Sequence, residues 1–214
     1  MKKLAISLAA ALTLAALATQ PARAGLVMDL TGGGSATPCG ACGAIGETVG
    51  WSFRVTNAIT IDGLGVWDAG SDGIGPATQA GLWTSAGTLL ASAPVSNAST
   101  VVASASNQGS WLMETISLLT LLPGDYLIGA VFYDSTPTAQ LGSSFTNVSD
   151  ITVGGGVRVG SANSGLAAPL AAFGLDIFGP TMRLAAPNTV PEPTGLALVG
   201  LGLFGLAAFR RRSA

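Results

Sequence analysis

The feature that most constrains the fold is a series of short segments in which apolar and polar residues alternate. In residues 49–57, VGWSFRVTN, the apolar side chains of Trp51, Phe53 and Val55 alternate with polar ones at 52, 54 and 56. A period of two is typical of a strand with one buried face. Further candidate strands span residues 58–67, 77–84, 87–95, 99–105, 110–118, 125–134 and 181–186.

Turn residues separate these segments. They include Ser-Ala-Gly at 85–87, Pro-Gly-Asp at 123–125 and Ser-Thr-Pro at 135–137, and the glycines at 63 and 65 predict a bulge inside a strand. The part of the chain between its two ends, which we call the body, contains no long amphipathic helical pattern. We therefore expect an all-β fold, a β-sandwich or jelly roll. Residues 136–180 are rich in Gly, Ser and Ala, and we expect long loops or irregular strands there.

The N-terminus has the pattern of a secretory signal peptide. Lys2 and Lys3 precede an uncharged run from Leu4 to Thr19, and Ala22 and Ala24 are small residues at the −3 and −1 positions of a cut after residue 24. The alternative is a permanent membrane helix, but the run is shorter than the roughly 20 residues that a span needs.

The C-terminus has a second uncharged run, Gly195–Phe209, followed by Arg210, Arg211 and Arg212. As a helix of about 1.5 Å per residue this run is about 22 Å long, so it inserts only with local thinning and snorkelling of the arginines. The positive-inside rule keeps the arginines in the cytoplasm and the body outside. We expect a single short transmembrane helix at about 194–209.

Val190, Pro191, Glu192 and Pro193 stand just before this helix. The Pro-Glu-Pro triplet, the short apolar helix and the terminal arginine cluster together resemble the PEP-CTERM sorting signal of Gram-negative bacteria. The resemblance implies an exosortase as processing partner, cleavage near the triplet, and release or transfer to the cell surface and its exopolysaccharide. The alternative is a simple C-terminal anchor on a proline-stiffened stalk.

These segments divide the chain into a signal peptide at 1–24, a Gly-rich segment with a C-x-x-C motif at 25–48, a sandwich domain at 49–186 and a sorting and anchor segment at 187–214. Between the two ends, ten acidic residues face three arginines and no lysine or histidine, a net charge of −7. This charge disfavours nucleic acid as a partner. It is compatible with an exported domain that binds calcium or neutral sugars, or with acidic residues that only keep the domain soluble.

The body carries a second, less specific resemblance. Residues from about Val49 to Asp134, including LGVWD, AGLWT and LLPGDYLIGAVF, resemble a sandwich domain found in many exported PEP-CTERM proteins. That domain is similar in plan to carbohydrate-binding modules. Likeness of fold does not imply an activity.

Asp68 and Asp72 lie four residues apart, with Gly73 after them, as in an acidic calcium loop. The loop departs from the helix-loop-helix calcium motif, because Gly70 occupies the third position and Gln79 the twelfth. A polar Asp-Gly turn between strands explains the same residues, and we favour it over calcium. No other cofactor is expected.

Cys39 and Cys42 form a C-x-x-C motif. Because the chain is expected to be exported and lacks both a second Cys pair and any histidine, a disulfide is favoured over zinc or a reactive dithiol. Four tryptophans and two tyrosines suit either core packing or a sugar-stacking platform. Their phase with apolar neighbours favours the core.

The absence of histidine, and of lysine from the body, removes the Ser-His-Asp, Cys-His and Ser-Lys nucleophile systems. A catalytic carboxylate pair, as in glycosidases, is not removed by this argument, but no spacing in the sequence indicates which two acids would form it. We expect no enzyme. The predicted role is structural or adhesive, at the cell surface or within exopolysaccharide, with a carbohydrate-binding module as the alternative and the ligand-binding residues unknown.

Overall fold

The computed structural model describes residues 25–33, 44–133, 143–173 and 179–186. Every regular element in these ranges is a β-strand, which confirms the expected all-β class. The strands are β1 (Met28–Gly33), β2 (Thr48–Val55), β3 (Ile59–Ala69), β4 (Thr78–Thr84), β5 (Leu89–Val95), β6 (Thr100–Ala103), β7 (Gly109–Leu121), β8 (Gly124–Val131), β9 (Ser143–Asn147), β10 (Ile151–Arg158), β11 (Ala171–Ala172) and β12 (Pro180–Leu184).

The larger sheet has six strands in the order β11-β10-β2-β8-β4-β5. Strand β2 lies near its middle and pairs antiparallel with both β10 and β8. Trp51, Phe53 and Val55 are buried while Arg54 is exposed, so the predicted alternation of β2 is confirmed. The face carrying the three apolar side chains is the one that must pack against a second layer.

The second sheet has four strands in the order β12-β3-β7-β6. Its register shifts between Ile61 and Gly63, where the glycines had predicted a bulge. Gly65 allows close contact with the neighbouring strand, because a Cβ there would lie 2.5 Å from the carbonyl oxygen of Leu112 and closer still to the sulfur of Met113. A side chain at this position would push β3 and β7 apart.

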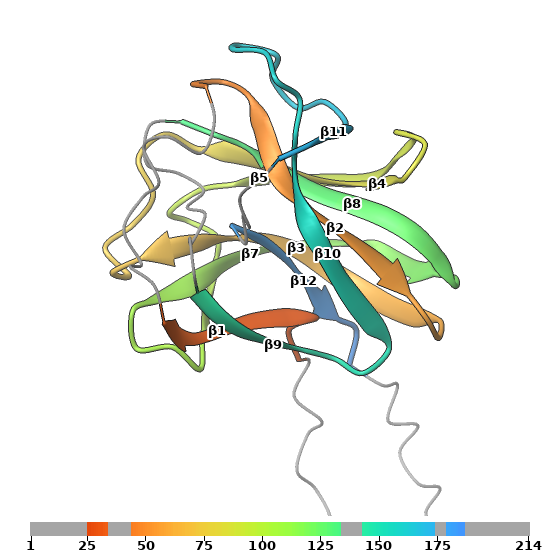
Figure 1. Ribbon diagram of the computed structural model, residues 1–214. Coiled ribbons are helices and arrows are strands. Elements are labelled where there is room, and N and C mark those ends of the chain that lie inside the picture. Colours follow the sequence, from red (N-terminus) through yellow and green to blue (C-terminus); the bar gives the residue numbers. More distant parts are fainter. Residues whose placement is uncertain (1–24, 34–43, 134–142, 174–178, 187–214) are drawn as a thin grey trace, which may run out of the picture. The chain divides into compact units, whose positions relative to one another are not determined.

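The two sheets share one core, consistent with a β-sandwich (Figure 1). Trp51 from the larger sheet and Trp67, Trp111 and Met182 from the smaller one are all at most 1% exposed. The indole N–H of Trp51 donates to the carbonyl of Pro180, 2.8 Å away, which joins the layers by a buried hydrogen bond. Fully burying a large apolar side chain contributes about 1.5–3 kcal/mol, so this core is the main stabilising feature.

The burial of the tryptophans supports the core-packing hypothesis. Trp83, the fourth, is 3% exposed and belongs to a smaller cluster with Leu127 and Val157, covered by Leu166 and Ala168. None of the four therefore offers a free ring face for a sugar.

Strand β1 lies inside the segment 25–48 that the sequence placed before the sandwich. It pairs antiparallel with β9, and the backbone N–H of Val27 donates to the carbonyl of Met182 at 2.8 Å. Val27, Met28 and Leu30 are buried in the shared core. Residues 25–33 are thus part of the folded body.

The eight predicted strands appear as β2 to β8 and β12, with shifted ends. The region 136–180, for which long loops or irregular strands were expected, contains β9, β10 and β11. The register shifts where β9 pairs with β1 and where β10 pairs with β2. The predicted signal peptide, the Cys39–Cys42 pair, the turn at 135–137 and the C-terminal helix lie outside the described residues.

Candidate functional site

Asp68 is the penultimate residue of β3, and its carboxylate bonds the loop that follows the strand. The side chain is only 4% exposed, and its two oxygens accept the backbone N–H of Gly73 at 3.1 and 3.2 Å. Gly70, Ser71 and Gly73 have φ values of 81°, 56° and 98°, so the loop runs through the left-handed region that glycine adopts without strain. The carboxylate therefore holds a tight turn.

A second side chain closes the same loop from outside. The amide oxygen of Asn97 accepts the N–H of Ile74 at 2.8 Å, and its amide nitrogen donates to the carbonyl of Ile74 at 3.0 Å. A Cβ at Gly73 would lie 3.1–3.2 Å from this amide. The loop 68–74 is thereby fixed to the connection between β5 and β6.

Burial raises the pKa of Asp68 above its ordinary value, and the nearby charge of Asp72 adds to this, against the lowering effect of the Gly73 hydrogen bond. Asp72 itself is exposed. Among the residues that the structure describes, no group of three or more His, Cys, Asp and Glu side chains is placed to hold a metal ion. The geometry fits the polar turn, and calcium binding by Asp68 and Asp72 stays a prediction.

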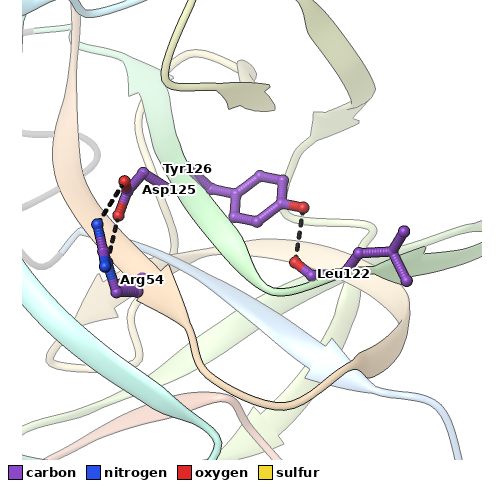
Figure 2. Close-up of polar contacts among 4 residues, drawn as sticks. All are labelled: Arg54, Leu122, Asp125 and Tyr126. Atoms are coloured by element: carbon purple, nitrogen blue, oxygen red, sulfur yellow. Dashed lines mark hydrogen bonds and ion pairs between the residues drawn. The ribbon is translucent and has the colours of Figure 1, made fainter.

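The outer face of the larger sheet carries an open hollow over β2, β8 and β10, which we call the β2–β8 hollow. Its lining residues include Ser52, Arg54, Asp125, Tyr126 and Thr152. Figure 2 shows the Arg54 guanidinium donating to Asp125 through Nε and Nη2, both at 2.8 Å. Asp125 raises the pKa of Arg54, first by hydrogen bonding and second by its charge.

The tyrosine of this hollow is fixed at both ends. Its ring stacks on Phe53 with centroids 5.6 Å apart. Its hydroxyl donates to the carbonyl of Leu122 at 2.8 Å (Figure 2). Because neighbouring residues of a strand point to opposite faces, Tyr126 packs toward the core while Arg54 and Asp125 lie on the outer face. The exposed ion pair alone can offer hydrogen bonds to a polar ligand such as a sugar. Sequence pattern alone did not indicate this pair, although Arg54 stood on the polar face of β2 and Asp125 in a turn signal.

The other carboxylates in the described ranges serve as acceptors for the protein's own donors. Asp29 accepts the indole N–H of Trp111 at 2.7 Å, the hydroxyl of Ser104 and the N–H of Ala105. The buried Glu47 accepts the backbone N–H groups of Ala44 and Gly160. Further acceptors are Asp62 from Arg183, Glu114 from Ser99, and Asp150 from Asn57. These acidic side chains position loops and strand ends.

The predicted sorting residues, Val190 to Pro193 and Arg210 to Arg212, lie outside the described residues. The described ranges contain no helical segment that could span a bilayer.

Comparison with known families identifies the C-terminal segment. The model of the PEP-CTERM protein-sorting motif matches residues 189–212, which contain both the Pro-Glu-Pro triplet and the three arginines. The predicted resemblance is thereby confirmed. No curated protein and no solved structure matches the chain. The resemblance of the body, from about Val49 to Asp134, stays a hypothesis.

Proposed function

We propose, from the premise that the chain carries a PEP-CTERM sorting motif, that its sandwich is a structural or adhesive module of the cell surface or of exopolysaccharide. The motif at residues 189–212 carries this proposal. It marks the chain as an exported, membrane-anchored precursor in a Gram-negative bacterium, with an exosortase as processing partner. The structural or adhesive role of the mature body is the step that we add.

The use of the acidic side chains supports a structural role. Asp29, Glu47 and Asp68 each accept hydrogen bonds from backbone or indole N–H groups, as described above. A carboxylate committed to such donors stabilises the loop that it holds and is a poor general base. We therefore propose that the body is not an enzyme.

A carbohydrate-binding module remains the alternative, and the β2–β8 hollow is the observation that favours it. Arg54 and Asp125 form an exposed planar pair on the outer face of β2 and β8 (Figure 2). Sugar hydroxyls bind such pairs through several hydrogen bonds at once. The buried tryptophans argue against a large stacking platform.

Complementation of a strain that lacks the chain separates these roles. Surface adhesion and matrix retention should fall in that strain and return with the wild-type chain. Under the structural role, Arg54→Ala and Asp68→Asn restore both. Failure of Arg54→Ala alone, with Arg158→Ala as a folded control, would favour the sugar-binding alternative. Failure of Asp68→Asn together with loss of a hydrolytic activity would favour an enzyme, and unchanged adhesion in the deletion strain would contradict the proposal.

A further inference from the structure

The backbone leaves the body at a place that strand pairing fixes. The N–H of Leu184 donates to the carbonyl of Gly25 at 2.8 Å, so the first and last described segments lie side by side (Figure 1). The N–H of Ala185 donates to the carbonyl of Thr60 at 2.9 Å. The chain is therefore hydrogen-bonded to the smaller sheet as far as Ala185.

The same hydrogen bond leads across the sheet to β7. Thr60 pairs with Thr120, and the two hydroxyls are 3.0 Å apart. Leu118 and Leu122 stand two residues to either side of Thr120 and are 67% and 64% exposed. Two large apolar side chains thus flank Thr120, which lies one strand beyond Thr60, the residue that the departing chain contacts.

A bulge contributes to the exposure of Leu118. Ile61 pairs with Leu119 and Gly63 with Thr115, so between these pairs one residue of β3 faces three residues of β7. The extra residues of a bulge leave the ladder and bend the strand. Arg183 holds this bulge, since it bonds Asp62 at 2.6 Å and the hydroxyl of Thr115 at 3.1 Å. The bulge is a built feature of the sheet.

The charge of this face differs from that of the body. Ten acidic residues against three arginines make the body strongly acidic, but Asp62 and Arg183 balance one another here. The hydroxyls of Thr60, Thr115 and Thr120 supply polar groups around the leucines. A neutral face with exposed leucines, hydroxyls and one arginine suits the boundary between lipid headgroups and acyl chains.

The tether between body and anchor is short. Nine residues, 186–194, separate Ala185 from the uncharged run that begins at Gly195. Fully extended, they reach at most about 3.3–3.6 Å each, or about 30 Å together. Under the proposed anchoring of the precursor by residues 195–209, the body therefore stays close to the bilayer surface.

We infer that the face formed by Leu118, Thr120, Leu122 and Thr60, which we call the exit face, rests on the bilayer surface while the chain is anchored. The lipid headgroup region is its partner. This inference rests on the proposed anchoring of the precursor. It adds a second membrane contact made by the folded body, in addition to the anchor.

Tryptophan fluorescence of the full-length chain tests the inference. The chain is reconstituted in phosphatidylethanolamine–phosphatidylglycerol vesicles whose acyl chains carry bromine, which quenches nearby indoles. Variants Leu118→Trp and Leu122→Trp place an indole on the exit face, and Val101→Trp places one at a 63% exposed position of β6. The four native tryptophans are at most 3% exposed, which keeps their own quenching low. Unchanged melting temperatures verify that each variant folds.

The expected result is blue-shifted and quenched added emission for Leu118→Trp and Leu122→Trp, with neither effect for Val101→Trp. Flotation of the vesicles separates the two levels of the proposal. A chain that floats, but whose added indoles at 118 and 122 stay unquenched, refutes the docking alone. Equal quenching at 101 also overturns it, because the exit face would then not be distinguished. A chain that does not float refutes the anchoring and the docking together.

Discussion

At Asp68 a carboxylate is buried beside the charge of Asp72, and burial is the larger cause of its raised pKa. A carboxyl with a higher pKa in the folded state than in the unfolded state holds its proton more tightly when folded. Between the two pKa values, the folded state therefore binds more protons, and the free energy of unfolding falls as pH rises. The contribution of Asp68 to stability is thus greatest at acidic pH and is lost as pH rises through the folded pKa.

The variant Asp68→Asn should reveal this dependence. Asparagine keeps an acceptor for Gly73 but does not titrate, so the stability of the wild type relative to the variant should rise as pH is lowered from 7 toward about 4, the ordinary range of an aspartate. Urea unfolding of both proteins across this range measures the difference. A difference that stays constant, or falls with acidification, would contradict the cause assigned to the pKa.

Asp29 is the acceptor on which the packing of Trp111 depends. The variant Asp29→Ala leaves the indole N–H of a fully buried tryptophan without its 2.7 Å partner, so we expect a loss of about 2–3 kcal/mol in the free energy of unfolding. Denaturant unfolding measures it. The exposed Asp72→Ala serves as the control and should change stability by less than about 0.5 kcal/mol. Equal effects would mean that the Asp29 bonds contribute little.

At the scale of single strands, sequence pattern predicted those whose own alternation carries the signal. In β2, buried Trp51 and Phe53 flank the less buried Ser52. A half-buried strand is the common explanation of such an alternation. Strands β1 and β10 were not predicted, because glycines interrupt their pattern, as in the run Gly154–Gly156. Such strands form because a distant partner supplies the pairing, which β-propensity does not encode.

The candidate sites show the same division. Sequence chemistry identified the Asp68 turn, since the residues that form it are adjacent in the chain. The pair Arg54–Asp125 joins β2 to β8 across 71 positions, and only their register brings it together. The predicted disulfide between Cys39 and Cys42 lies outside the described residues and stays a prediction.

Strand β4 depends on a glycine beneath an aromatic ring. A Cβ at Gly81 would lie 2.7 Å or less from two ring atoms of Trp83, and this ring cannot move without leaving its cluster. Gly81→Ala should therefore cost about 1–3 kcal/mol, measured by thermal or urea unfolding. Gly155→Ala in β10 is the matched strand control, because its Cβ meets nothing within 4 Å. A larger loss at Gly155 than at Gly81 would contradict this account of β4.

For the whole molecule, the distance between the body and the sorting motif is the quantity to vary. Ala185 is hydrogen-bonded in the sheet and Val190 stands just before the Pro-Glu-Pro triplet, so four residues with a reach of about 14 Å separate them. Deleting residues 187–189 should slow removal of the tail, because a membrane enzyme would have less room beside a folded domain.

Pulse-chase labelling in the native host measures this rate. A Gly-Ser-Gly insertion after Thr189 is the control and should process at least as fast as the wild type. The body's melting temperature should be unchanged in both variants, since neither alters a described strand. Equal processing of all three chains would show that the folded body does not limit access.

The central claim is that this chain is an exported precursor whose tail directs sorting, and the intact mass of the native protein tests it most directly. The protein is isolated from the membrane and medium fractions of its own host. We predict a mature form that begins at Gly25 and ends near Pro191–Pro193, without the matched segment that follows. A chain that keeps its tail through Ala214 in the membrane fraction, with no shortened form in the medium, would contradict the account and make the tail a permanent anchor.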